Sequence, residues 1–112
     1  MTTHQMNLQP KYFDFIKDGT KRIELRLYDE KRQTIQLGDI IEFSKSENDS
    51  LKAEVIGLLR YQTFNELFKD FDISILADES MTKQELLDTL SKFYTSEKQA
   101  KYSVLGIRLR IL

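Results

Sequence analysis

The chain has 112 residues, of which 40% are hydrophobic and 31% charged, and its formal net charge is −1. This length fits a single domain, residues 1–112, that can bury its own core, and the composition is that of an ordinary globular protein. The nearly neutral charge excludes a protein that holds long nucleic acid by its phosphates alone, because such proteins are strongly basic. Any nucleic-acid role must therefore depend on a local patch or on recognition of one nucleotide.

The chain contains no cysteine and only one histidine, His4. The lack of cysteine excludes disulfides, a thiolate zinc site and a cysteine nucleophile. His4 is expected to be a solvated terminal residue rather than a metal ligand or catalytic base. We therefore expect neither a metal nor a cofactor. No apolar run reaches the ~18 residues of a membrane span, and the N-terminus does not resemble a signal peptide, so we expect a cytoplasmic protein without a membrane partner.

Strands are expected where apolar residues alternate or cluster between turn residues. The predicted strands cover residues 6–8, 23–27, 40–43, 51–61 and 104–112. The polar segment 28–36 is expected to be a loop or a short helical turn, and 44–50 a hairpin loop. Gly57 lies inside the longest strand and indicates a bulge or bend of the kind that a closed barrel needs.

Helices are expected at three places, each with its own start signal. The first covers residues 10–18, because Pro10 suits the first helical turn and Gly19 commonly ends a helix. The other two begin after capping boxes at Thr63 and Thr82. Their apolar stripes are predicted to face the core rather than a cofactor: Phe64, Leu67, Phe68 and Phe71 in one, and Leu86, Leu87, Leu90 and Phe93 in the other. Short loops between the middle strands favour a mixed or antiparallel α+β barrel over a parallel sheet.

The densest cluster of charge lies where Gly19 leads into the second strand and comprises Lys21, Arg22, Glu24 and Arg26. Physical chemistry alone favours a solvated strand face with cross-strand ion pairs, since exposed charged strand faces are common. In a regular strand the side chains of Lys21 and Glu24 would point to opposite faces. They can share a pocket only if Lys21 still belongs to the turn.

A longer pattern of residues resembles the ASCH domain family. It reads Leu8-x-Pro10-x-Tyr12-Phe13-x-x-Ile16-x-x-Gly19-x-Lys21-x-x-Glu24-x-Arg26, then Gly38-Asp39-x-Ile41-x-Phe43, and ends with a closing strand after Tyr102. The resemblance covers nearly the whole chain. It implies an α+β fold, a small PUA-like β-barrel of about five or six strands with two or three flanking helices. It also implies a charged cleft for RNA or a nucleotide-like ligand.

One branch of this family hydrolyses the acetamide of N4-acetylcytidine, and residues 79–86 resemble its Glu-x-Met-Thr-x-x-Glu-Leu segment. The resemblance implies that Lys21 corresponds to the catalytic lysine and Glu79 to the catalytic glutamate. Glu24 replaces the threonine of that branch. A carboxylate beside Lys21 is expected to raise the pKa of the lysine, which is the wrong direction for a general base. In an enzyme, Glu24 would instead activate a water molecule, with Glu79 as proton shuttle.

Three functions follow, and all site predictions assume that Lys21, Glu24, Arg26 and Glu79 converge on one cleft. The favoured function is a module that binds RNA or a nucleotide or nucleoside, because Glu24 replaces the threonine of the hydrolytic branch. In such a module Lys21 and Arg26 contact phosphate or a base edge, and Glu24 accepts from an exocyclic amine. Tyr28 or Tyr102 stacks on the base. The second is an amidohydrolase for N4-acetylcytidine or a related nucleoside, using Lys21, Glu24 and Glu79. The third is a protein-interaction domain without a small-molecule site.

Overall fold

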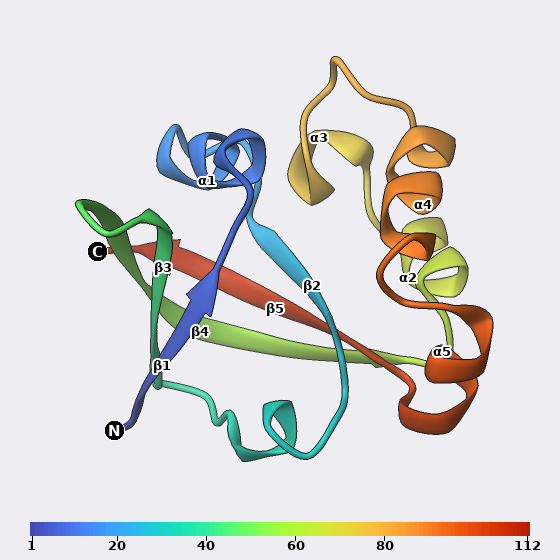
Figure 1. Cartoon of the computed structure of the whole chain (residues 1–112), viewed down its shortest axis with the longest axis horizontal. Helices are drawn as coiled ribbons and strands as arrows, with labels where there is room; N and C mark the ends of the chain where they lie inside the picture. The colour runs from blue at the N-terminus through green and yellow to red at the C-terminus, as the bar shows by residue number, and fades with distance from the viewer.

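The computed structural model describes residues 1–112 and contains one five-stranded sheet that curls into a half-barrel (Figure 1). Its strands are β1 (Thr3–Asn7), β2 (Ile23–Leu27), β3 (Ile40–Ser46), β4 (Asp49–Tyr61) and β5 (Val104–Ile111). Their order is β1-β3-β4-β5-β2, with β1 parallel to β3 and every other pair antiparallel. The predicted α+β fold with a mixed barrel-like sheet is confirmed.

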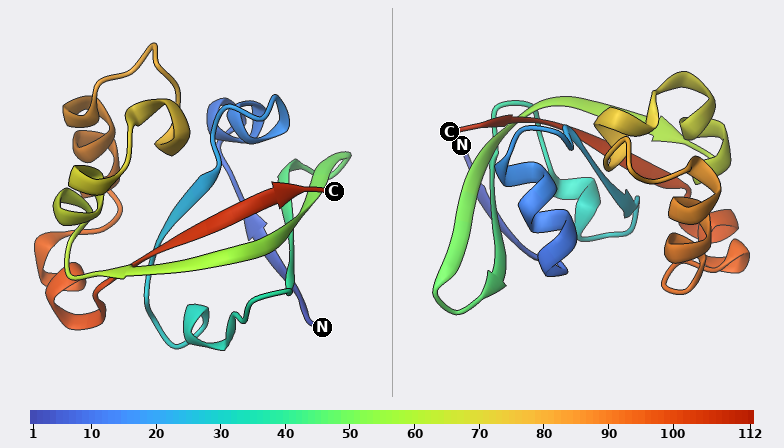
Figure 2. Two further views of the ribbon diagram at one scale, coloured as in Figure 1. Left: turned by 180° about the vertical axis from the view of Figure 1, so that it is seen from behind. Right: turned by 90° about the horizontal axis from the view of Figure 1, so that it is seen from above.

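Five α-helices and one 3-10 helix surround the sheet, more than predicted. They are α1 (Pro10–Lys17), η1 (Arg32–Thr34), α2 (Phe64–Asp70), α3 (Ile73–Leu76), α4 (Lys83–Ser91) and α5 (Ser96–Tyr102). Figures 1 and 2 show α2 to α5 gathered on one side of the sheet beside β2, while α1 packs at the end of the curl. None of these helices has the length and apolar character that crossing a lipid bilayer requires.

Each predicted helix start is confirmed. Pro10 occupies the first turn of α1, and Gly19, at φ 85°, takes the left-handed conformation after that helix. The Thr82 side chain accepts from the backbone N–H of Glu85, whose own side chain accepts from the Thr82 N–H, so the capping box of α4 is complete. Thr63 caps α2 in one direction only. The unpredicted α3 and α5 are short helices, capped by Asp72 and Thr95.

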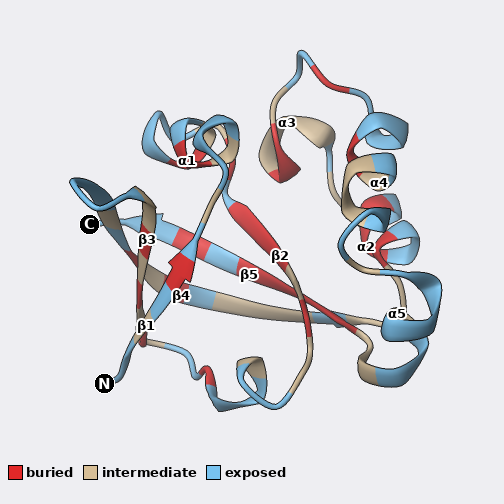
Figure 3. Cartoon of the chain, viewed as in Figure 1, coloured by how far each residue is buried: buried red, intermediate tan, exposed pale blue.

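Buried side chains form two clusters, one on each face of the curled sheet. Figure 3 marks the buried residues of the sheet and the helices in red. The first cluster lies inside the curl, where Phe13 and Ile16 of α1 meet apolar residues of β3, β4 and β5. The second lies between the outer face of the sheet and α2 to α4, and it includes Ile23, Leu25 and Leu27. The alternation of β2 therefore directs its apolar face to the helices and its polar residues toward the inside of the curl.

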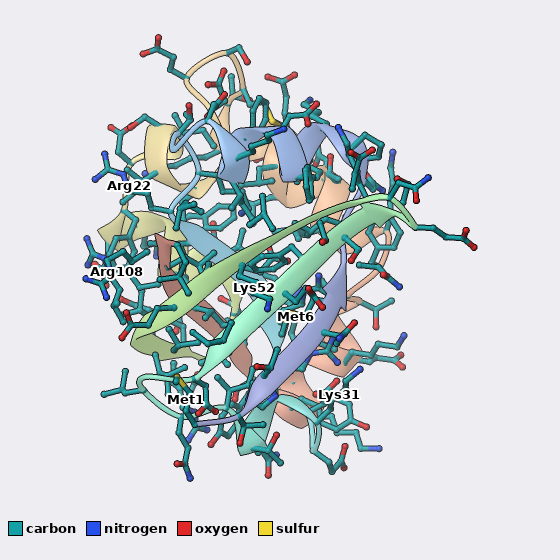
Figure 4. All side chains as sticks on the ribbon, turned by 90° about the vertical axis from the view of Figure 1, so that its left-hand side faces the viewer. Met1, Met6, Arg22, Lys31, Lys52 and Arg108 are labelled. Atoms are coloured by element: carbon teal, nitrogen blue, oxygen red, sulfur yellow. The ribbon has the colours of Figure 1, made fainter.

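Two features of β4 shape the sheet. Its pairing with β5 shifts register between Val55 and Gly57, which is the predicted bulge. A Cβ atom at Gly57 would lie 2.9 Å from the Cβ of Arg108, so this close approach requires glycine. The hairpin from β3 is tighter than predicted, because pairing extends from Ser46 to Asp49 and leaves only residues 47–48 in the loop. Figure 4 shows β1, β3 and β4 side by side.

The N-terminus is held more firmly than the sequence suggested. β1 begins at Thr3, and His4 is not a solvated terminal residue: its side chain is only 13% exposed. The reason is the buried carboxylate of Asp39, which accepts hydrogen bonds from the backbone N–H groups of Thr2 and Gln36. The same carboxylate lies 2.8 Å from Nε2 of His4. Hydrogen bonds from His4, Gln36 and Thr2 lower the pKa of Asp39 to about 2. Asp39 therefore fastens β1 to the start of β3.

Asp39→Asn is expected to lower the free energy of unfolding at neutral pH by about 2 kcal/mol, since each unit of pKa shift corresponds to about 1.4 kcal/mol. Because folding depresses the pKa of Asp39 from 3.8 to about 2, its contribution is complete above about pH 5 and is lost as the pH falls toward 2. Urea unfolding at several pH values measures this. Asp14→Asn, which removes the ion pair of an exposed carboxylate with Lys45, is the control and is expected to change stability by less than about 1 kcal/mol. A pH-independent loss in Asp39→Asn would contradict the assignment.

Candidate functional site

A cavity of about 210 Å³ opens between β2, α4 and the connection from β1 to α1. We call it the triad cavity, because three charged side chains line it: Lys21, Glu24 and Arg26. Most of its remaining wall is apolar or aromatic, and comes from Leu8, Tyr12, Leu25, Leu86, Leu90, Phe93 and Tyr94. The cavity therefore combines a small charged cluster with an apolar wall, the usual composition of a small-ligand site.

Lys21 lies in the turn before β2 and not in the strand itself. Its side chain therefore lines the same cavity as that of Glu24. Its side chain is buried, and Nζ donates to the backbone carbonyls of Ile23 and Leu76, both at 2.6 Å. Glu24 Oε1 is 3.5 Å from the same nitrogen. An ammonium has three N–H donors, and three acceptors surround this one. Two N–H groups of Lys21 are therefore used by backbone carbonyls, and the third faces Glu24 in an ion pair.

Glu24 lies between the two cations. Its Oε1 faces Lys21, while Oε2 accepts from Nε of Arg26 and lies 2.8 Å from Nη2 of the same residue. Nη2 also donates to the backbone carbonyl of Asn7 at 2.9 Å, which joins β2 to the end of β1 across the open side of the curl. The solvated strand face expected from the charge alternation is wrong for Glu24, which is only 4% exposed because it lies on the inward face of β2.

The triad carries two positive charges and one negative charge. Burial lowers the pKa of Lys21, and the neighbouring Glu24 carboxylate opposes this shift without reversing it. Glu24 acts on the pKa of Lys21 in the expected upward direction, but the net shift is downward, because desolvation of the ammonium outweighs one shared carboxylate. For Glu24, burial acts against the ionised form, but the charges of Arg26 and Lys21 hold its pKa below the ordinary value. A carboxylate held ionised in this way is a weak general base.

Glu79 does not join the other three predicted residues. It is exposed in the loop between α3 and α4 and does not line the triad cavity. Its neighbours explain the orientation: Asp78 accepts from the Ser80 N–H at 3.0 Å, and Met81 is buried in the second core cluster. The segment 79–86 is thus accounted for by an anchoring methionine, the capping box of α4 and the buried Leu86. The predicted convergence holds for three residues and fails for Glu79.

Tyr28 and Tyr102 also lie elsewhere. They line a second cavity of about 720 Å³, which we call the polar groove, together with Arg60. The aromatic residues of the triad cavity are instead Tyr12, Phe93 and Tyr94. Phe93 was predicted to face the core, but it is 51% exposed because it follows the end of α4, at the rim of the triad cavity. Tyr12 was part of the recognised sequence pattern, whereas nothing in the local sequence pointed to Tyr94.

Besides the triad, the polar side chains of Asn7, Gln9 and Tyr12 line the cavity and make no side-chain hydrogen bond within the chain. The hydrogen bonds of the Arg26 guanidinium to Glu24 and Asn7 use Nε and Nη2 but not Nη1, and the Tyr94 hydroxyl lies beside the same guanidinium. The Thr89 hydroxyl donates to the backbone carbonyl of Glu85 at 3.0 Å. No group of three or more His, Cys, Asp or Glu side chains is placed to hold a metal ion. The arrangement is suited to holding a small ligand by shape, charge and a few donors.

Glu24→Thr is expected to lower the free energy of unfolding by about 3 to 5 kcal/mol, because it leaves two buried cations without their counter-charge. Glu54→Thr is the matched control: its carboxylate pairs with the exposed Arg110, and removing it is expected to change stability by less than about 1 kcal/mol. Urea unfolding of both variants at neutral pH makes the comparison. Equal losses would mean that the triad is no more important to folding than a surface ion pair.

Comparison with known proteins shows which proteins this chain resembles in sequence and in fold. The family model of the ASCH domain matches residues 6–111. The hypothetical protein PH0355 has 35% sequence identity and a TM-score of 0.89, covering 99% of this chain and 100% of that one. PF0455 from Pyrococcus furiosus has 32% identity and a TM-score of 0.80, over 99% and 98% of the two chains.

A more distant structure is a point mutant of ZmASCH from Zymomonas mobilis, with 13% identity and a TM-score of 0.68 over 98% of this chain and 70% of that one, which is a likeness of fold alone. A search of curated proteins gave no match. The family model spans nearly the whole chain and includes every residue of the triad, and two structures above 30% identity cover 99% of it. The chain therefore belongs to the ASCH domain family.

Proposed function

We propose that the triad cavity binds one planar heterocycle, the base of an RNA nucleotide or of a free nucleotide or nucleoside, and that the protein acts by binding. The observation that carries the proposal is a small cavity, about 210 Å³, with aromatic walls and a buried cluster of excess positive charge. Aromatic side chains stack on bases, and buried donors select their carbonyl oxygens. We also propose that the protein is cytoplasmic.

Each wall of the cavity has a role in this proposal. Nη1 of Arg26 donates to a carbonyl oxygen or ring nitrogen of the base. Glu24 accepts from an exocyclic amine through Oε1, since Oε2 already faces two nitrogens of Arg26 whereas Oε1 has only Lys21 at 3.5 Å. Phe93, at the half-open rim, stacks on the face of the ring. Lys21 contributes positive charge without a free N–H, so it supports the site rather than contacting the base.

Binding is favoured over hydrolysis by the positions of the residues that hydrolysis would use. Glu79, the residue that corresponds to the catalytic glutamate, lies outside the cavity. Lys21 is saturated with acceptors, and the cations around Glu24 lower its pKa. An amide hydrolase needs a general base that can take a proton from water or from a nucleophile, and neither residue is free to do so.

Phe93→Ala is expected to weaken binding of cytidine by about tenfold, since stacking of a base on an aromatic ring contributes about 1 to 3 kcal/mol. Titration of the isotope-labelled protein with cytidine, followed by amide chemical shifts, gives the affinity and the position of the site. Shifts are expected in β2 and in the segment from Thr89 to Tyr94. Ile56→Ala is the control, because Ile56 is exposed to a similar extent and lines no cavity.

An absence of shifts with cytidine, uridine and purine nucleosides alike would contradict the proposal. So would equal affinities of Phe93→Ala and wild type for the ligand that binds best. Shifts confined to residues outside the triad cavity would place any binding elsewhere and would overturn the assignment of this cavity.

Wild-type protein incubated with N4-acetylcytidine is expected to release no cytidine beyond the uncatalysed background, for the reasons given for Glu24 and Glu79. Chromatographic separation of the nucleosides measures this directly. Turnover that Glu24→Gln abolishes while Glu79→Gln leaves it intact would show that Glu24 is catalytic, and hydrolysis would then replace binding as the function. The thermal unfolding of each variant should be recorded alongside, because Glu24 also stabilises the fold.

A further inference from the structure

The polar groove is hollowed where the end of β4 and the segment after β2 meet α5, and Figure 1 shows α5 beside this end of the sheet. Arg60 and Lys101 are its only charged lining residues, and no carboxylate lines it. The rest of the lining consists largely of neutral hydrogen-bonding side chains, among them Gln33, Gln62, Thr63, Ser96, Gln99 and Ser103. A hollow with two cations and no acid favours an anionic ligand.

Neither cation of the groove has an ion-pair partner within the chain, although each lies over an aromatic ring, Tyr28 for Arg60 and Tyr102 for Lys101. None of the six ion pairs in the structure includes Arg60 or Lys101. The guanidinium of Arg60 lies 3.7 Å from the centre of the Tyr28 ring. Stacking orients the planar group while leaving its N–H edge free, which reduces the entropy lost when an anion binds. Arg60 is therefore a pre-oriented donor for a phosphate.

The groove also contains the only non-glycine residue with positive φ. Ser103 has φ 61° and ψ −176°, a conformation that costs about 1 to 3 kcal/mol outside glycine and occurs mainly where surrounding contacts enforce it. Here the contacts are hydrogen bonds from the Ser103 N–H to the Gln99 carbonyl and from the Tyr28 N–H to the Ser103 carbonyl. They hold Tyr28 and the end of α5 together across the groove.

The groove adjoins the triad cavity. Arg26 lines one and Tyr28 the other, and two residues of extended chain separate their Cα atoms by about 7 Å. On the helical side Tyr94 lines the triad cavity, and the side-chain amide of Gln99, in the groove, donates to the Tyr94 carbonyl at 2.9 Å. A ligand whose base enters the triad cavity would therefore have its next covalent unit at the groove.

We infer that the polar groove binds a phosphate group of a nucleotide chain, adjacent to the nucleotide whose base enters the triad cavity, with Arg60 and Lys101 as the phosphate ligands. This inference rests on the proposed function and goes further, because it makes the ligand a single-stranded chain rather than a free nucleoside. Two phosphate contacts are also compatible with the net charge of −1, since they need no extended basic surface.

The test compares cytidine, its 3′- and 5′-monophosphates and single-stranded oligocytidylate with wild type and Arg60→Gln. Arg108→Gln is the matched control, since Arg108 also lies over an aromatic ring, Phe71, and makes no ion pair, but lines no cavity and projects from the outside of the sheet (Figure 4). The oligonucleotide is expected to bind wild type about tenfold more tightly than cytidine at low salt. The slope of log affinity against log salt is expected near −0.7, because the groove holds one phosphate of a single strand.

Arg60→Gln is expected to remove most of this gain and to reduce the slope by about 0.7, while its affinity for cytidine stays unchanged. An oligonucleotide that binds no more tightly than cytidine would overturn the inference and leave the base site intact. Equal losses in Arg60→Gln and Arg108→Gln would also overturn it, by showing general attraction to positive charge. If nucleosides fail to bind but oligocytidylate binds through Arg60, the groove is a phosphate site and the base pocket is wrong.

Discussion

The Glu24 carboxylate, buried between Lys21 and Arg26, is the contact on which the arrangement of this domain depends. Through Lys21 it connects the turn after α1 to the carbonyl of Leu76 in α3, and through Arg26 it connects β2 to the carbonyl of Asn7 at the end of β1. Segments far apart in the chain therefore meet at one carboxylate. A buried charge triad is seldom more stabilising than well-packed apolar residues, but losing one member is severe, because the others are then unpaired. What the triad provides is a fixed geometry.

That fixed geometry explains why the same residues can support a ligand site without being free to catalyse. A residue whose donors are all used by the protein cannot move a proton without breaking the contacts that hold α3 and β1 in place. Lys21 is such a residue, with two carbonyls at 2.6 Å and a carboxylate beside it. Arg26 differs because its hydrogen bonds to Glu24 and Asn7 do not use Nη1. In this site Lys21 stabilises the fold, whereas Arg26 is the cation that can contact a ligand, although both belong to the same sequence motif.

Sequence patterns predicted the features that local physics determines. The caps of α1 and α4, the bulge at Gly57 and the alternation of β2 follow from short-range propensities, and the resemblance of the motif supplied the barrel. Features that depend on distant partners could not be predicted. His4 is held by the pairing of β1 with β3 and by Asp39, thirty-five residues later. Glu24 is buried because its two cation partners, the connection from β1 to α1, and α4 lie around it. Glu79 matched a motif in which Met81 and Thr82 serve packing and capping in this chain.

The division of the predicted site into two cavities follows from the geometry of β2 itself. Glu24, Arg26 and Tyr28 are spaced by two residues, so they share the inward face of one extended segment, and the sequence suggested a single site for all of them. An extended segment rises about 3.3 Å per residue, however, so the first and last of these side chains lie about 13 Å apart at the backbone. That distance exceeds the size of one base. A ligand that touches both ends of this face must itself be extended. A nucleotide chain has the required alternation of groups, because its base can contact Arg26 while its phosphate contacts Arg60, which lies over Tyr28.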